Sequence, residues 1–437
     1  MSTPLGRRAL LGGAAAGAGA LALGRADSAA AGPRDHSPGR LRVRPGADVA
    51  QAADWSVLRG QRVGVITNPT GVVQSTLASI VDAMVSSGHV EVAAVFGPEH
   101  GFRGTAQAGA SEDTYVDERT GVTVYDAYGA DAAKFAALYA ASGVETVVFD
   151  IQDVGARFYT YIWTLYQAMI AASRAGLRFV VLDRPNPTGG AARGPVLRPG
   201  FTSGVGQDAI AQAHGMTVGE VARFFDGEFL PGLAGRRLPD LHVVRVQGWR
   251  ADMLYEDTGL PWILPSPNMP SPTTALLYPG TCLFEATNLS EGRGTTLPFE
   301  LIGAPYVDHR WAEALNRRGL AGVRFREAFF TPTFSKNADQ VCGGVQVHVT
   351  DAHRVDPIAV ATHMLVALRD LYEKFDWRLV GGASDGGRWL DLLTGSDRFR
   401  LQLEAGATAP EIVAGWRGEL RTFDRTRRSY LLYPRNR

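Results

Sequence analysis

Short apolar runs that alternate with longer helical patterns constrain the fold of this chain more than any other feature. A continuous apolar run predicts a strand that is buried on both faces, and a helix between two such runs predicts that the strands pair in parallel. We therefore expect an α/β fold with a doubly wound parallel sheet. The expected strands are 62–67, 91–96, 122–125, 144–150 and 178–183, and the expected helices are 75–87, 132–141, 163–175 and 214–225.

The pattern changes in the second half of the chain. Residues 262–305 are rich in Pro, Gly, Asn, Ser and Thr, and a long irregular stretch of this kind is usually functional. Helical patterns and one strand beyond it predict a second, smaller α+β domain, and a length of 437 residues also favours more than one domain. We place the main domain at 55–300 and a C-terminal auxiliary domain at 301–437. The later elements are expected at 308–318, 344–350, 356–374 and from 410 onward.

The N-terminus has the features of an export signal. Arg7 and Arg8 precede an apolar run at 9–24, which ends near small residues at 28–31. The paired arginines indicate the twin-arginine export route. A transmembrane anchor is the alternative, but the run is interrupted by glycine and is shorter than a membrane span. We expect 1–31 to be the signal and 32–54 a linker, and we expect an exported protein without stable membrane insertion after signal removal.

The charge of the chain is balanced, because lysine plus arginine and aspartate plus glutamate both number 44. This balance argues against nucleic acid and against an anionic membrane surface as partners. A ligand that is neutral, or charged at only one point, suits the composition better. The two cysteines, Cys282 and Cys342, could pair in an exported protein or remain as two buried thiols, and the sequence leaves both possibilities open.

Polar side chains follow the expected strands at the points where they end. In an open parallel sheet, ligands bind beyond the carboxyl ends of the strands, so these side chains should meet in one crevice. Any one of them has a structural explanation, such as a helix cap or a local ion pair. Taken together they predict a carboxylate-rich site. The set consists of Asn68, Glu99, His100, Asp150, Asp153 and Asp183, and the irregular segment adds Glu291 and Arg293.

Several common chemistries lack their motifs in this sequence. No Gly-rich dinucleotide loop, Walker sequence, His-Glu-x-x-His set or Gly-x-Ser-x-Gly elbow is present, so we expect no cofactor and no metal site. Carboxylate chemistry remains. Cleavage of a glycosidic bond needs an acid for the leaving oxygen and a second group for the oxocarbenium-like centre. We predict that Glu99 is the acid. His100 either orients it or makes a structural hydrogen bond, and Tyr159 and Trp262 either cover a sugar face or belong to the core.

Seven motifs of this chain resemble the exo-β-N-acetylmuramidase family, which was long catalogued as a domain of unknown function. The resemblance runs from about residue 60 to the C-terminus and is most specific before residue 305. It implies a Rossmann-like domain, a C-terminal auxiliary domain and a site between them. The motifs are NPTG at 68–71, GPEHGFRG at 97–104, DIQDVGARFYTY at 150–161, DRPNP at 183–187, PSPNMP at 265–270, YPGTCLFE at 278–285 and NLSEGRGTT at 288–296.

The resemblance also implies an activity, namely removal of terminal β-1,4-linked N-acetylmuramic acid from the non-reducing end of peptidoglycan fragments. It implies Glu99 as the catalytic residue, and the partner is then a peptidoglycan-derived muramyl saccharide. The lactyl carboxylate of this sugar calls for a fixed cation, and guanidinium binds carboxylate with two hydrogen bonds. The expected ligands of the sugar are Arg103, Arg157 and Arg293 for the lactyl group, Asn68, Asn268 and Asn288 for the hydroxyl or acetamido groups, and Asp150, Tyr159 and Trp262.

The sequence leaves the second catalytic group open between Asp153 and Glu291. If the acetamido oxygen of the substrate attacks the anomeric carbon, the second acid would orient that amide, and no glycosyl-enzyme would form. Two other functions remain as alternatives, a non-catalytic cell-wall sugar-binding protein and a metal-dependent hydrolase. The stereochemical outcome and the oligomeric state are also open.

Overall fold

The structure is a computed structural model, and it describes residues 43–105, 112–382 and 387–435. The expected export signal and most of the expected linker lie outside the described residues. Within the described part of the chain, no helix is long and apolar enough to cross a membrane.

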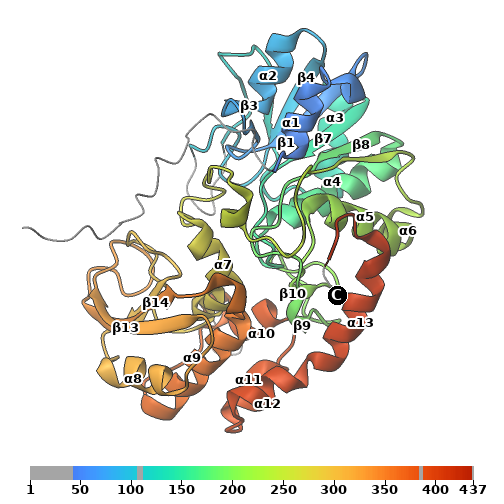
Figure 1. Cartoon of the computed structure of the whole chain (residues 1–437). Coiled ribbons are helices and arrows are strands. Elements are labelled where there is room, and N and C mark those ends of the chain that lie inside the picture. Colours follow the sequence, from blue (N-terminus) through green and yellow to red (C-terminus); the bar gives the residue numbers. More distant parts are fainter. Residues whose placement is uncertain (1–42, 106–111, 383–386, 436–437) are drawn as a thin grey trace, which may run out of the picture. The chain divides into compact units, whose positions relative to one another are not determined.

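Seven strands of the described residues form the central sheet, in the order β11-β8-β7-β1-β4-β6-β5 (Figure 1). All neighbours pair in parallel except β5, which runs antiparallel at one edge. The chain therefore builds outward from β1 in one direction and then from β7 in the other, so the topological switch lies between β1 and β7. This confirms the doubly wound, Rossmann-like fold. The strands are β1 (Arg62–Thr67), β4 (Glu91–Gly97), β5 (Tyr115–Val116), β6 (Thr123–Asp126), β7 (Thr146–Asp150), β8 (Arg178–Leu182) and β11 (Leu241–Val244).

Helices cover both faces of this sheet, because successive side chains of a strand point to opposite faces. Val63 and Val65 of β1 pack with helices α1 (Gly46–Ala52) and α2 (Ile80–Ser87) in one hydrophobic cluster. Ile66 of the same strand belongs to the other cluster, with side chains of the helices on the opposite face. Those helices are α3 (Ala132–Ser142), α4 (Tyr161–Ala175) and α5 (Val218–Glu228).

Two local predictions near the N-terminal part need correction. The expected linker at 32–54 contains helix α1, whose Asp48 is buried and accepts hydrogen bonds from the backbone of Gln74 and Ser75, both at 2.9 Å. The helix expected at 75–87 begins at Ile80, because β2 (Val72–Val73) and β3 (Ala78–Ser79) form a short hairpin before it. By contrast, the capping box of Thr217 and Glu220 is present at the start of α5, although the helix begins after His214.

The segment expected to be irregular, 262–305, contains helix α7 (Pro272–Thr281). Ser271 caps it by accepting a hydrogen bond from the backbone of Thr274 at 3.0 Å, and Pro272 occupies the first turn, where its missing N–H costs nothing. A Cβ on Gly280 would lie 1.8 Å from the carbonyl oxygen of Pro357, so this glycine permits the close approach of α7 to helix α9 (Pro357–Leu371).

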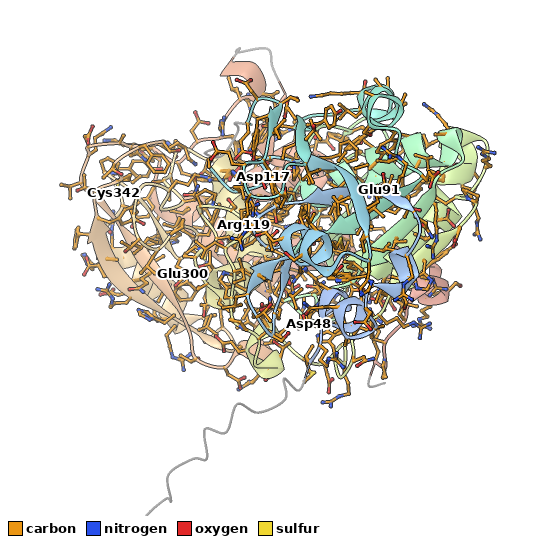
Figure 2. The ribbon with its side chains drawn as sticks, turned by 90° about the horizontal axis from the view of Figure 1, so that it is seen from above. Asp48, Glu91, Asp117, Arg119, Glu300 and Cys342 are labelled. Atoms are coloured by element: carbon orange, nitrogen blue, oxygen red, sulfur yellow. The ribbon has the colours of Figure 1, made fainter. Side chains whose placement is uncertain are left out.

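The C-terminal part is a smaller α+β assembly, as predicted. Its sheet has the antiparallel order β12-β14-β13, and β13 was not expected from the sequence. Cys342 lies on β14 (Figure 2), and both Cys342 and Cys282 are buried free thiols. The elements are β12 (Leu301–Ala304), α8 (His309–Arg317), β13 (Val323–Phe330), β14 (Cys342–Val349), α9, α10 (Trp389–Thr394), α11 (Arg398–Glu404), α12 (Ala409–Gly415) and α13 (Arg417–Arg427).

Candidate active site

Polar residues gather where β1, β4 and β7 end, on both sides of the topological switch. Asn68 follows β1, Glu99 follows β4, and the loop between β7 and α4 carries Asp153, Tyr159 and Thr160. Because β1 pairs with both β4 and β7, these three carboxyl ends are neighbours in the sheet. The fold therefore brings these side chains to one edge of the sheet, where the sequence predicted a crevice.

Glu99 is half-buried and is tied to the β7–α4 loop. The hydroxyl of Thr160 donates a hydrogen bond to Oε2 of Glu99 at 3.0 Å. His100, the next residue, is buried and has a φ of 72°, which side chains of this size rarely adopt. Backbone strain of this kind is concentrated at functional sites. The turn thus holds Glu99 at the carboxyl end of the sheet with one oxygen engaged.

The charges of Glu99 and Asp153 both influence the hydroxyl groups of two tyrosines, Tyr159 and Tyr161. Burial raises the pKa of Tyr159 well above its usual value, and the charges of Tyr161, Asp153 and Glu99 raise it further. Burial likewise raises the pKa of Tyr161, with further contributions from Glu99 and Asp153. The two rings contact each other edge to face at 5.4 Å, and the Tyr161 hydroxyl donates to the carbonyl oxygen of Pro265 at 2.7 Å. Both carboxylates therefore raise the pKa of the same two hydroxyl groups.

Asp153 is buried, and a histidine that the sequence did not single out holds it in place. Oδ2 of Asp153 accepts the backbone N–H of Gly155 at 2.6 Å and lies 3.3 Å from Nε2 of His214. Nδ1 of His214 accepts the backbone N–H of Met216 at 3.2 Å, so the ring proton is on Nε2 and points at Asp153. His214 is 61 residues away from Asp153 in the chain, and no sequence motif links the two.

Gly155 is required for this arrangement. Its φ is +77°, and a Cβ there would lie 2.5 Å from Oδ1 of Asn186. Only glycine combines this backbone conformation with the close approach.

The three predicted arginines are all engaged with other groups. Arg103 is partly exposed and forms ion pairs with Asp82 at 2.9 Å and Asp117 at 2.8 Å; Figure 2 marks Asp117. Arg293 pairs with Glu285 at 2.7 Å and with Glu291 at 3.2 Å. Both guanidinium groups are thus largely neutralised by acidic neighbours.

Arg157 is fully buried, so the structure does not support the expectation that it binds substrate. Its guanidinium donates to the carbonyl oxygens of Pro195 at 3.2 Å, Ile210 at 3.0 Å and Leu393 at 2.5 Å. It joins the β9–β10 hairpin, β9 (Arg193–Val196) with β10 (Ala211–Ala213), to the end of α10. The guanidinium is thus engaged with backbone carbonyl groups from three segments of the fold.

Asp150 likewise has a structural role in this conformation. It is 0% exposed, and its carboxylate forms an ion pair with the buried guanidinium of Arg184, which also donates to the carbonyl oxygen of Val72 at 2.9 Å. Both oxygens of Asp150 accept hydrogen bonds from Arg184, and this pairing does not support the expectation that Asp150 contacts substrate.

Glu291 does not belong to the group around Glu99. Its two oxygens face Arg293 at 3.2 Å and the amine of Lys336 at 2.9 Å. The ring of Tyr278 contacts Tyr159 at 5.5 Å and Phe299 at 4.8 Å, and Arg293 lies over Phe299. Glu291 is thus linked to Tyr159 only through Arg293 and the rings of Phe299 and Tyr278 in these contacts.

The remaining predicted ligands come from the segment after residue 260. Asn268 is buried, and its backbone N–H points at Ser266, whose side chain lies beside the Tyr159 hydroxyl. Trp262 is half-buried; its Nε1 donates to the carbonyl oxygen of Met269 at 3.0 Å. Asn288 bonds to the backbone of Lys374 and to the Tyr306 hydroxyl, which accounts for both ends of its amide. Asn268 is therefore the member of this set that lies nearest the tyrosine pair in these contacts.

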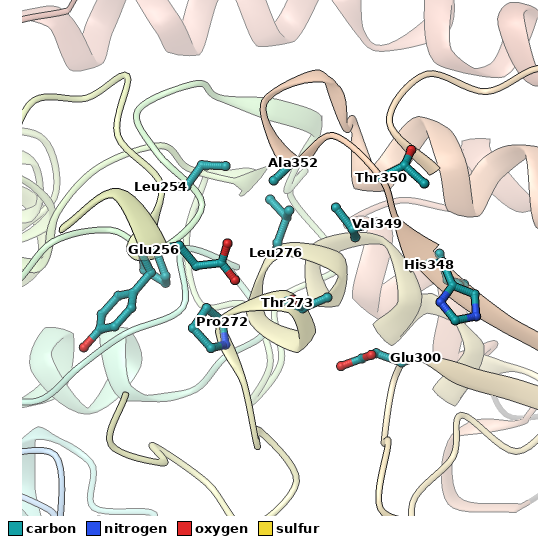
Figure 3. A pocket seen from close by; sticks show the side chains of 13 residues that line it. Leu254, Glu256, Pro272, Thr273, Leu276, Glu300, His348, Val349, Thr350 and Ala352 are labelled. Carbon is teal, nitrogen blue, oxygen red and sulfur yellow. The ribbon is translucent and has the colours of Figure 1, made fainter. Parts of the chain in front are cut away.

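A separate cavity of about 410 Å³ lies between the segment 254–276 and strand β14 (Figure 3). The carboxylates of Glu256 and Glu300 and the imidazole of His348 line it. Glu300 accepts hydrogen bonds from Thr274 at 2.6 Å and Ser271 at 3.4 Å, so this acid stabilises the start of α7. None of the predicted site residues lines this cavity. Within the described residues, no group of three or more His, Cys, Asp or Glu side chains is placed to hold a metal ion.

The comparisons with known proteins confirm the family resemblance. Two family models, described as the N-terminal and C-terminal parts of exo-beta-N-acetylmuramidase NamZ, match residues 63–273 and 276–433. They meet near residue 275, whereas the domain boundary near residue 300 stays a prediction. The peptidoglycan beta-N-acetylmuramidase NamZ of Bacillus subtilis (strain 168) is 42% identical over 420 residues, which cover 95% of this chain and 98% of that protein.

Two solved structures extend this similarity to the fold. Both are crystal structures of DUF1343 family proteins from Bacteroides fragilis NCTC 9343. One has a TM-score of 0.79 and 33% identity, covering 91% of this chain and 100% of its own. The other has a TM-score of 0.69 and 31% identity, covering 90% of this chain and 99% of its own. The chain therefore belongs to the exo-beta-N-acetylmuramidase NamZ family.

Proposed function

We propose that this protein is an exo-acting glycoside hydrolase that removes terminal β-1,4-linked N-acetylmuramic acid from the non-reducing end of peptidoglycan fragments, with Glu99 as the general acid. The full-length match to a peptidoglycan beta-N-acetylmuramidase is the observation that carries this function. The position of Glu99 supports its role. It is half-buried at the switch point of the sheet, and its Oε2 accepts a hydrogen bond from the hydroxyl of Thr160 at 3.0 Å.

The site geometry favours Asp153 over Glu291 as the second catalytic carboxylate. The charges of Asp153 and Glu99 raise the pKa of the same two tyrosine hydroxyls, those of Tyr159 and Tyr161. Glu291 is held between Arg293 and Lys336, so both of its oxygens already face cations. A carboxylate that must stabilise a developing positive charge works best when its own charge is not already neutralised.

We propose that Arg103 binds the lactyl carboxylate of the substrate. Arg103 follows Glu99 by four residues, and its side chain is 29% exposed. Its pairing with Asp82 and Asp117 fixes the plane of the guanidinium but also lowers its net charge. Arg103→Met should therefore reduce the preference for muramic over glucosamine substrates, and an unchanged preference would remove this residue from the proposal.

The role of Glu99 is tested by Glu99→Gln on two substrates that differ in their leaving group. With the natural muramyl disaccharide, loss of the acid should lower kcat by about 10²–10⁴-fold. With a 4-nitrophenyl muraminide the loss should be much smaller, because nitrophenolate leaves without protonation. Glu145→Gln is a matched control, since Glu145 precedes β7 and bonds to the backbone of Arg62 at the opposite edge of the sheet.

An equal loss of activity on both substrates would contradict the acid role of Glu99. Tight binding of the disaccharide without any turnover by the unaltered protein would favour the sugar-binding alternative. Inactivation by a chelator, reversed by added metal, would favour a metal-dependent hydrolase.

We also propose that the protein is exported through the twin-arginine route, on the evidence of Arg7, Arg8 and the apolar run that follows. Replacement of both arginines by lysine should retain the protein in the cytoplasm, which fractionation of the producing cells would show. Unchanged export of that variant would reject this route.

A further inference from the structure

We propose, on the basis of the function above, that Asp153, Tyr159 and Asn68 bind the acetamido group of the substrate and make its carbonyl oxygen the nucleophile of the reaction. The starting observation is a set of buried polar atoms without hydrogen-bond partners in the described structure. Among the eleven such atoms of the described residues, three belong to the group around Glu99: Nδ2 of Asn68, Oδ1 of Asp153 and the hydroxyl of Tyr159, in side chains that are 2%, 4% and 8% exposed.

Unsatisfied polar atoms are rare in protein interiors, because burial without a partner is costly. Here the three atoms belong to one small group. The charge of Asp153 raises the pKa of both Tyr159 and Tyr161, and the side-chain amide of Asn68 faces the Tyr161 hydroxyl. Tyr159 lies near Ser266 but has no hydrogen bond of normal geometry. A cluster of three such atoms beside Glu99 indicates that a ligand completes their hydrogen bonds.

The donor and acceptor types match a secondary amide. An acetamido group offers one N–H donor and one carbonyl acceptor. Oδ1 of Asp153 can only accept when ionised, so it suits the N–H. Nδ2 of Asn68 can only donate, and the Tyr159 hydroxyl can donate, so both suit the carbonyl oxygen. A sugar with a hydroxyl in place of the acetamido group would leave part of this set unpaired.

The second carboxylate oxygen of Asp153, Oδ2, is held by two donors of the protein. This oxygen accepts the Gly155 N–H at 2.6 Å and faces the Nε2–H of His214 at 3.3 Å. These two donors fix the plane of the carboxylate, so that Oδ1 is the oxygen left for the substrate. His214 is therefore a positioning residue that acts through Asp153.

His214 is itself held by the C-terminal segment. Its carbonyl oxygen accepts from Arg427 at 2.9 Å, and the next carbonyl, of Gly215, accepts from Arg427 at 2.6 Å and from Arg435 at 2.8 Å. Residues near the C-terminal end of the described chain thus help to fix the orientation of the Asp153 carboxylate through His214.

The reaction then proceeds in two balanced steps. The acetamido oxygen forms a bond to the anomeric carbon while the glycosidic bond breaks, and Glu99 gives its proton to the departing sugar oxygen. Asp153 stabilises the positive charge that develops on the amide nitrogen of the resulting oxazolinium ring. Water then attacks the anomeric carbon, gives a proton to Glu99 and opens the ring, which restores the acetamido group. The β configuration is retained, and no glycosyl-enzyme forms.

A series of 4-nitrophenyl muraminides with acetyl, fluoroacetyl, difluoroacetyl and trifluoroacetyl groups tests this mechanism in the unaltered protein. Fluorine makes the amide oxygen a weaker nucleophile, so kcat should fall with each fluorine added. The sugar released first should be the β anomer, seen by NMR in the first minutes of reaction. Rates that do not depend on fluorine, or release of the α anomer, would overturn the inference while leaving the muramidase function intact. No turnover of any muraminide would instead reject the proposed function.

Variants assign the roles. Asp153→Asn should lower kcat by about 10²–10³-fold, the loss typical when one preorganised transition-state contact is removed, and should flatten the dependence on fluorine. Tyr159→Phe removes only a hydroxyl and should lower kcat by about 10-fold or more, the loss expected for one hydrogen bond to a developing charge. His214→Ala should flatten the same dependence, which a change in stability alone would not do.

Asp240→Asn is the matched control, because Asp240 is exposed and pairs with Arg178 at the amino ends of the strands. It should leave both kcat and the fluorine dependence unchanged. If Asp153→Asn and Tyr159→Phe both keep the full fluorine dependence of the unaltered protein, these side chains do not bind the amide.

Discussion

Replacement of Arg157 by methionine separates a structural from a substrate-binding role for this buried guanidinium. Methionine keeps most of the aliphatic volume but removes the donors to Pro195, Ile210 and Leu393. Each buried carbonyl left without a donor costs about 1–3 kcal/mol, so three give about 3–9 kcal/mol. Burial also lowers the pKa of Arg157, to about 9, which shows that the fold carries a desolvation cost for this charge. Removal of the charge recovers part of that cost, so we expect a net loss near the lower end, about 3–4 kcal/mol.

Two measurements on the variant distinguish the roles. Urea unfolding followed by tryptophan fluorescence gives the loss in the free energy of unfolding. The ratio of turnover on muraminide and glucosaminide substrates gives the selectivity, which we expect to be unchanged. An Arg157→Met variant with normal stability and a lost preference for muraminide would refute the structural interpretation and restore Arg157 as a ligand of the lactyl group.

Two further predictions concern buried ionisable groups. Burial raises the pKa of Asp183 from 3.8 to about 7, so the folded state keeps a proton there that the unfolded chain releases above pH 4, and the free energy of unfolding should fall as the pH rises from about 4 to 7. Asp183→Asn should flatten this part of the pH profile in urea unfolding, and an identical slope would show that Asp183 is ionised in the native state. The two cysteine thiols are buried and unpaired, so a thiol reagent should modify neither in the native protein and both in urea; a thiol count of zero in urea would show a disulfide instead.

The sequence predicted the sheet well because its strands are buried on both faces. The run 144–150, for example, has three consecutive apolar residues at 147–149, and this signal does not depend on the rest of the fold. The missed strands are of another kind. β13 alternates buried with exposed residues, including Arg324 and Arg326, and β11 is a partly exposed edge strand that contains His242. Such strands are stabilised by one neighbour only, so their sequence carries a weaker signal.

Helix α7 was missed for a different reason. Its Pro272, Pro279 and Gly280 lower the helix propensity of the segment. In the fold, Pro272 stands where no N–H is needed, and Gly280 allows contact with Pro357. Tertiary packing thus overrides local propensity at two positions that the sequence alone marks as breakers.

The site could be located from the sequence, but the roles of its residues could not be assigned. The end of a strand fixes where Asn68, Glu99 and Asp153 lie, since parallel strands share one carboxyl edge. It does not fix which ion pairs form. Asp150 ends β7 and Asp153 lies three residues further on in the loop that follows, yet Asp150 meets Arg184 in a buried ion pair and Asp153 meets His214.

Function at this sheet edge depends on which carboxylate the fold leaves with an unsatisfied oxygen. A buried acid that is paired with guanidinium, as Asp150 is, has its charge balanced and stabilises the loop. A buried acid whose donors all lie on one oxygen, as those of Asp153 do, keeps the other oxygen for a ligand. The partners that create this difference, Arg184 and His214, come from distant parts of the chain, and each is a single residue without a motif. Sequence patterns therefore identify the loops of such a site, whereas its chemistry follows from long-range pairings that only the folded chain reveals.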